Sequence, residues 1–213
     1  MVSMMMRNLV MSSLSAPDAV ERFEERMFDL ASQQEVDIRA EDVAGLEDLG
    51  ERYVRETLRL LEACVTAADQ ARIRDMVAPV LAACERFFMQ HDQRVPDQGG
   101  LFGLICNGYM ARGLLELVSE QTRQNRGFPL LATDPHAEAE IIISLIGADV
   151  AETLDVIVDE VYLTPQVRFA AKNIYGLTGS LRATGRVSEW EARWEDRIAA
   201  FSAETGIAFT TAA

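Results

Sequence analysis

Residues 134–184, DPHAEAEIIISLIGADVAETLDVIVDEVYLTPQVRFAAKNIYGLTGSLRAT, decide the fold because their charge changes sign at one turn. Positions 127–167 contain eight acidic residues and no Lys or Arg, whereas positions 161–188 contain four basic residues and no acid. The change falls at Leu163-Thr164-Pro165, and both Asp134-Pro135 and Thr164-Pro165 place a capping residue before a proline at the first helical position. We therefore predict two helices, the first ending near Tyr162, that fold back on each other about Thr164.

This hairpin gives a register in which an acidic stripe faces a basic one. One interpretation is a row of interhelical ion pairs, each worth about 0–1 kcal/mol if it is exposed. The other is a functional cleft, in which carboxylates hold a divalent cation and the basic residues bind an anionic group, as in magnesium sites that add substrate phosphate to carboxylates. We favour the first, because ion-pair stripes are common on helix surfaces. The expected facing pairs are Asp159 with Arg168, Asp155 with Lys172, and Glu152 with Tyr175.

Apolar residues recur at helical spacing along nearly all of the chain, and no segment alternates as a strand does. The most apolar segment, residues 101–124, is expected to be central and buried, and Gly103, Gly108 and Gly113 would let a neighbour approach it closely. The loops between the expected helices are short, so successive helices should be antiparallel neighbours. The fold class we predict is all-α, a single irregular antiparallel bundle of six to seven helices.

The length of 213 residues suits one domain. We expect residues 1–14 to be a flexible N-terminal segment, because they are rich in Met and lack the pattern of a signal peptide, and Met11 is an alternative start to Met1. Residues 15–206 should form the bundle, and residues 207–213 a flexible tail.

Composition limits the partners of the protein. The net charge of −14 argues against nucleic acid or an anionic membrane surface as a binding partner, because proteins bind both through Lys and Arg. Cys64, Cys84 and Cys106 are far apart and show no metal-binding spacing, which indicates buried, reduced thiols in the cytoplasm.

Four polar side chains interrupt the apolar run at 101–118. A central helix must hydrogen-bond such groups or place them around a wet pocket. A satisfied network in the core or a position at the solvent edge is the favoured interpretation, and a small-ligand pocket is the alternative. These ligand-pocket candidates are Asn107, Tyr109, Arg112 and Glu116.

Glu152-Thr-Leu-Asp155 has the form ExxD. It resembles half of the signature of the all-α, magnesium-dependent nucleoside triphosphate pyrophosphatases, which pair an ExxE on one helix with an ExxD on the next. The available ExxE, Glu21 to Glu24, lies instead on the first expected helix. The resemblance covers only Glu152 and Asp155. In the cleft interpretation of the hairpin, Glu152, Asp155 and Asp159 would hold a magnesium ion, and Arg168 and Lys172 would bind phosphate.

A further helix should start at the capping box Ser188-Glu189-Trp190-Glu191. Its residues Trp190 and Trp194 are candidates for a surface that binds a protein partner or a second copy. The leading functional prediction is a non-catalytic, cytoplasmic helical binding or interaction protein without a cofactor, which holds a protein partner or a small molecule between its helices. The alternative is a magnesium-dependent phosphohydrolase that uses the acidic stripe.

Overall fold

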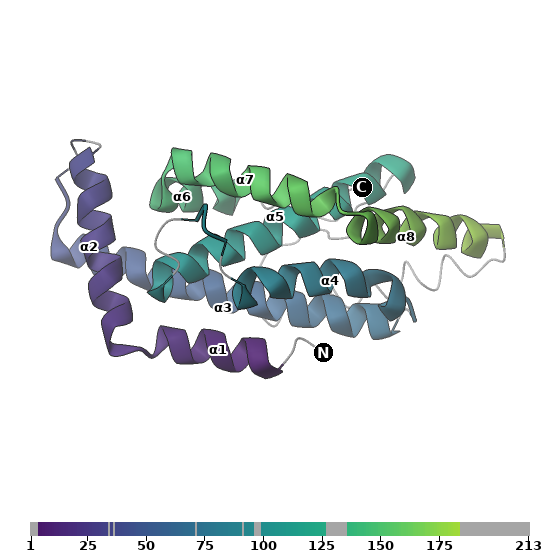
Figure 1. Ribbon diagram of the computed structural model, residues 1–213, viewed down its shortest axis with the longest axis horizontal. Helices are drawn as coiled ribbons and strands as arrows, with labels where there is room; N and C mark the ends of the chain where they lie inside the picture. Colours follow the sequence, from purple (N-terminus) through teal and green to yellow (C-terminus); the bar gives the residue numbers. More distant parts are fainter. Residues whose placement is uncertain are drawn as a thin grey trace.

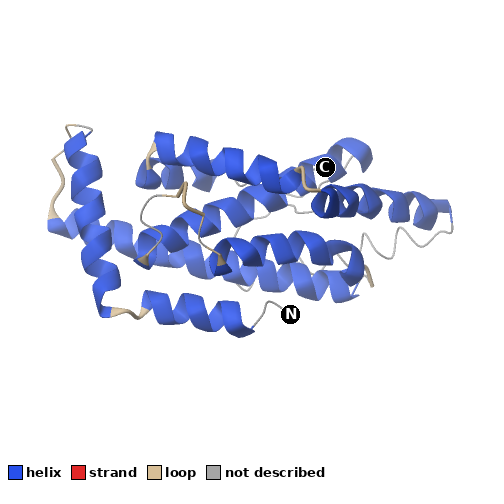
Figure 2. Cartoon of the chain, in the orientation of Figure 1, coloured by secondary structure: helices blue, strands red, loops and turns tan. Residues whose placement is uncertain are grey.

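The computed structural model describes residues 4–33, 35, 37–70, 72–90, 92–95, 99–126 and 136–183. Within these residues the chain forms eight helices and no strand (Figure 1, Figure 2), which confirms the all-α prediction. The helices are α1 Met4–Leu14, α2 Pro17–Gln33, α3 Ala40–Gln70, α4 Arg74–Met89, α5 Gly100–Arg126, α6 His136–Ile146, α7 Ala148–Tyr162 and α8 Pro165–Ala183.

Helix α5 is the centre of the bundle, as the sequence predicts for residues 101–124. It packs against each of the other seven described helices. In the described part of the chain it is also the single helix long and apolar enough to cross a membrane, yet 67% of its most apolar window is buried inside the molecule, as in the core helix of a soluble protein. Its buried apolar side chains are Leu101, Phe102, Leu104, Ile105, Cys106, Met110, Ala111, Leu114, Leu115 and Val118.

The other helices surround α5 in an irregular arrangement. In Figure 1, α3 and α4 lie along one side of α5 and α7 along the other, while α2 stands across one end of the bundle. The Arg26 guanidinium of α2 lies over the ring of Phe102 in α5, 5.2 Å from its centroid. Helix α2 therefore closes the end at which α3, α5 and α6 also meet.

Gly108 allows α3 and α5 to approach closely. A Cβ at this position would lie 3.1 Å from Cε1 of Tyr53 and 3.4 Å from Oγ1 of Thr57, both on α3. The first distance is tighter than ordinary van der Waals contact, so the Tyr53 ring would have to move by a few tenths of an ångström to admit a side chain here. The expectation that a glycine in this segment admits a neighbouring helix is confirmed at Gly108.

The N-terminal segment differs from the sequence expectation. We expected residues 1–14 to be flexible, but Met4–Leu14 forms α1, and the side chains of Met6 and Val10 are fully buried. The ion pair of Arg7 with Glu62 of α3, at 3.2 Å, also holds this helix on the bundle. Methionine is unbranched and fills irregular gaps in a core, which explains how a Met-rich segment can pack there.

The helix expected from Asp134 to Tyr162 is two helices. Gly147 ends α6 and precedes α7 with a φ of +91°, a conformation that glycine adopts without steric cost. An added Cβ would lie 3.5 Å from Cδ2 of Leu30 in α2, so the turn is packed against the helix that closes the end of the bundle.

Helices α7 and α8 do not form the predicted hairpin. Helix α8 packs mainly against α4 and then α5, and in Figure 1 it continues past the end of α7 rather than returning along it. Leu163 has right-handed helical angles, and the amide of Thr164 donates to the carbonyl of Val161 at 3.1 Å. The turn therefore deflects the chain without reversing it.

Burial explains why the charges do not determine this arrangement. Fully burying a Val or Ile side chain contributes about 1.5–3 kcal/mol, whereas an exposed ion pair contributes about 0–1 kcal/mol. Packing of the apolar face of α8 on α4 and α5 outweighs the ion pairs that a hairpin would have formed with α7. The buried residues of this face are Val167, Ala170, Ala171 and Ile174.

Candidate functional site

Two neighbouring hollows open between α3 and α6. The larger has a volume of about 200 Å³ and is closed at one end by α2. The smaller has a volume of about 70 Å³, and Ile141 lines both. The larger hollow is lined by Met27, Leu30, Ala31, Ile38, Leu46, Ile141, Ser144 and Leu145, and the smaller by Leu49, Arg52, Tyr53, Glu56, Ile141 and Ile142.

The walls follow from local sequence. Residues Leu46, Leu49, Tyr53 and Glu56 are spaced three or four apart, so they share one side of α3. On α6, Ile142 and Leu145 are buried, whereas Ile141 is 50% exposed. Because α6 ends at Gly147, its apolar face is set separately from that of α7, which packs on α5.

The smaller hollow has a polar wall backed by Arg112 of α5. Nε of Arg112 donates to Oγ1 of Thr57 at 2.8 Å, and the guanidinium lies 4.2 Å from the ring centroid of Tyr53. The Thr57 hydroxyl in turn donates to the carbonyl of Tyr53 at 2.8 Å. A terminal nitrogen of Arg112 lies 3.9 Å from Oε2 of Glu56, and these two side chains are only 13% and 16% exposed. Arg112 therefore fixes two of the residues that line the hollow.

Arg52 is the remaining charge on this wall. Its side chain is exposed, and it takes part in no ion pair or hydrogen bond within the described part of the chain. Of the two charged residues that line the smaller hollow, Glu56 already faces a cation and Arg52 does not face an anion. The hollow thus combines apolar walls with one arginine that makes no ion pair among the described residues.

The ligand-pocket candidates of α5 do not line the hollows. Asn107, Tyr109, Arg112 and Glu116 are all half-buried, and none of them lines either hollow. The hydroxyl of Tyr109 donates to Oδ1 of Asp155 on α7 at 3.0 Å. Burial, followed by the Asp155 carboxylate, raises the pKa of Tyr109 well above its usual range. Arg112 and Tyr109 thus connect α5 to α3 and α7, in line with the interpretation of a satisfied network.

The acidic and basic stripes do not converge. Glu152, Asp155 and Asp159 are exposed on α7, and Arg168 and Lys172 are exposed on α8. No ion pair joins the two helices among the side chains that the structure describes. Nor do three or more His, Cys, Asp or Glu residues of the described part form a group that could hold a metal ion. The side chain of Tyr175 lies outside the described residues.

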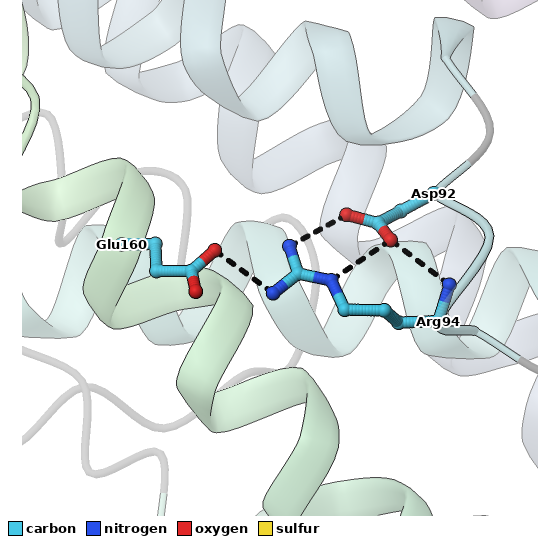
Figure 3. A network of polar contacts seen from close by, with 3 residues as sticks. All are labelled: Asp92, Arg94 and Glu160. Atoms are coloured by element: carbon cyan, nitrogen blue, oxygen red, sulfur yellow. Dashed lines mark hydrogen bonds and ion pairs between the residues drawn. The ribbon is translucent and has the colours of Figure 1, made fainter.

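Arg94 makes an ion-pair network on the surface instead. Figure 3 shows its guanidinium between Asp92, in the segment that follows α4, and Glu160 of α7. The nitrogen–oxygen distances of the two ion pairs are 2.8 Å to Asp92 and 2.9 Å to Glu160. The hydrogen bonds from Arg94 lower the pKa of Asp92. This network fastens the segment to α7, and its groups are all engaged with one another.

The cysteines are buried and free, as expected for Cys64, Cys84 and Cys106. Burial raises the pKa of Cys64 to about 12 and raises that of Cys84 further. A thiol held in its neutral form is a poor nucleophile, so these two side chains serve the core. Trp190 and Trp194 lie outside the described residues.

Comparison of the chain with protein-family models, curated proteins and solved structures found no match. The geometry of the described residues is therefore the basis for a functional proposal.

The hollows were not predicted from the sequence. Leu46, Leu49 and Tyr53 belong to the apolar stripe of α3, and such a stripe looks the same whether it meets a neighbour or a gap. The arrangement of α2 and α6 around this stripe decides the outcome. The sequence did offer a polar residue beside the stripe, Arg52, as an indication of a hollow. Such residues are common on the edge of any amphipathic helix, so this one is not specific.

Proposed function

We propose that this protein is a non-catalytic, cytoplasmic binding protein that holds a small apolar molecule between α2, α3 and α6. The observation that carries the proposal is the pair of hollows that share Ile141 and have mostly apolar walls with a few polar groups at one end. Sites for small molecules usually combine these features. The three buried, free cysteines support the cytoplasmic location, since disulfides are rare there.

The size of the larger hollow also supports a small ligand. An engineered apolar cavity of about 150 Å³ stays dry and binds benzene. The hollow of about 200 Å³ lies in the same range, and it adjoins a second space of about 70 Å³. The expected ligand therefore has an apolar body of about the size of one ring or a short alkyl chain.

A thermal-shift screen with small apolar compounds tests the proposal. A ligand at a hundred times its Kd stabilises the folded state by about 2.7 kcal/mol, which for a chain of this length raises Tm by roughly 5–10 °C. We expect such shifts for the wild type and their loss in Ile141→Arg, because Ile141 lines both hollows and the substitution replaces their shared apolar wall with a charged side chain. Retention of the shifts in Ile141→Arg would overturn the proposed location.

Val156→Arg is the matched control. Val156 is also a β-branched residue on a helix surface and is likewise 50% exposed, but it lines neither hollow. Both substitutions add one positive charge at a half-exposed position, so both variants should fold. Val156→Arg should keep the full ligand-induced shift.

The magnesium-dependent phosphohydrolase remains the competing hypothesis. Among the described residues, the carboxylates of α7 form no group that could hold a metal ion, and α8, which carries Arg168 and Lys172, packs mainly on α4. This arrangement gives the hypothesis no geometric support. The same screen should include Mg²⁺ and Mn²⁺ with nucleotides. Stabilisation that needs metal and phosphate together, and is lost in Asp155→Asn, would replace the binding proposal with the enzyme.

A further inference from the structure

We propose that the ligand carries an anionic head, in the form of a carboxylate, which Arg52 binds at the smaller hollow. This inference rests on the proposed function, because it specifies the chemistry of the ligand in the same site. The smaller hollow would take the head and the larger hollow the apolar body, with Ile141 at the point where the two meet.

The charges around the smaller hollow favour an anion. Glu56 lies opposite Arg112, and the ring of Tyr53 already carries that guanidinium on its face. A cationic ligand would therefore compete with Arg112 for both of its natural partners. Arg52 has no such partner in the described part of the chain, and a guanidinium matches a carboxylate in a planar, two-point arrangement.

The net charge of the protein makes the inference easy to test. At −14, the chain as a whole attracts cations and repels anions. If general electrostatics decided binding, an amine would bind more tightly than an acid with the same apolar body. Tighter binding of the acid requires a local positive group, and Arg52 is the cation that lines the hollow.

The experiment compares octanoate, octanol and octylamine, which have eight carbons each and differ in the head. The alkyl part of octanoate is one carbon shorter, which works against tighter binding of the acid. Titration calorimetry with the full-length wild type should give the tightest binding for octanoate. The expected preference over octanol is about 5–10-fold, the size of one charge-assisted hydrogen bond at a partly exposed site. Raising the ionic strength should reduce this preference, because the charges are accessible to salt.

Arg52→Gln and Arg59→Gln form the matched pair of variants. Both residues are exposed on α3 and both substitutions remove one positive charge, but Arg59 does not line the hollow. Arg52→Gln should lower octanoate affinity to that of octanol, and Arg59→Gln should leave the preference unchanged. Equal effects of the two substitutions would assign the preference to net charge and overturn the role of Arg52.

The outcomes separate this inference from the proposed function. If octanol binds in the wild type as tightly as octanoate, and both lose affinity in Ile141→Arg, the site is real and the anionic head is wrong. If octylamine binds most tightly, the head is cationic and the inference is overturned. If none of the three compounds binds the wild type, the proposed function fails, and the inference with it.

Discussion

The hydroxyl of Tyr109 donates a hydrogen bond to the carboxylate of Asp155, which the sequence predicted to pair with Lys172. The bond joins the central helix α5 to α7 across a distance of 3.0 Å between the two oxygens. Since α8 packs on α4 and α5, Asp155 instead interacts with the helix on which α7 lies.

A double-mutant cycle tests which partner Asp155 has. Tyr109→Phe and Asp155→Ala should each destabilise the fold, and their coupling energy should be about 0.5–1.5 kcal/mol, the usual net value of one hydrogen bond. Asp155→Ala with Lys172→Ala should show coupling near zero. Urea unfolding gives all the free energies. A larger coupling between Asp155 and Lys172 would restore the hairpin register.

The same bond makes stability depend on alkaline pH. Burial and Asp155 raise the pKa of Tyr109 above its ordinary value of 10.0, so the folded state holds a neutral hydroxyl where the unfolded chain has begun to ionise. This contribution is complete below pH 10 and is lost as the pH rises through the raised pKa. Between pH 9 and pH 11, the wild type should therefore lose more stability than Tyr109→Phe. The comparison is needed because burial also raises the pKa values of Cys64 and Cys84, which act with the same sign.

Two glycine substitutions should change stability in opposite directions. Gly147 has a φ of +91°, where a Cβ is strained, so Gly147→Ala should lower the unfolding free energy by about 1–2 kcal/mol. Gly45 lies inside α3 with no atom within 4 Å of an added Cβ, so Gly45→Ala should raise it by about 0.5–1 kcal/mol. Thermal unfolding measures both. A stabilising Gly147→Ala would mean that α6 and α7 are one helix.

The sequence was sufficient for features that depend on apolar spacing within one helix. The run from Leu101 to Val118 identified the buried central helix, and Pro165 marked the start of α8 correctly. These features are local, because a helix with an apolar face must bury it wherever its neighbours are.

Features set by neighbouring helices could not be predicted. A single glycine inside a helix costs only about 1 kcal/mol, so the sequence around Gly147 does not distinguish a tolerated glycine from a break packed against Leu30. The register of α7 and α8 was wrong for a similar reason. Charge complementarity predicts that α7 and α8 pair, but burial against α4 and α5 determines where the two helices lie. The hollows beside Ile141 likewise result from incomplete packing between α2, α3 and α6.

The network at Arg94 should make stability depend on acidic pH. Hydrogen bonds from Arg94 lower the pKa of Asp92 below its ordinary value of 3.8, so the network stabilises the fold above that pH and is lost as the pH falls through the lowered pKa. Arg94→Gln should therefore lower Tm slightly at pH 7 and match the wild type near pH 2. A difference in Tm that persists unchanged at pH 2 would show that Arg94 acts through packing instead of charge.

Arg112 should be the arginine whose geometry matters most to stability. Lysine keeps the charge but cannot donate from Nε to Thr57 or lie flat over Tyr53 as the guanidinium does. Arg112→Lys should therefore cost about 1–3 kcal/mol, because a part-buried hydrogen bond and a cation–π contact are both lost. Arg123→Lys, at an exposed pair with Glu120 in the same helix, is the control and should change Tm very little. If Arg112→Lys and Arg123→Lys change Tm equally little, Arg112 contributes its charge alone. The wall of the smaller hollow then does not depend on the planar shape of the guanidinium.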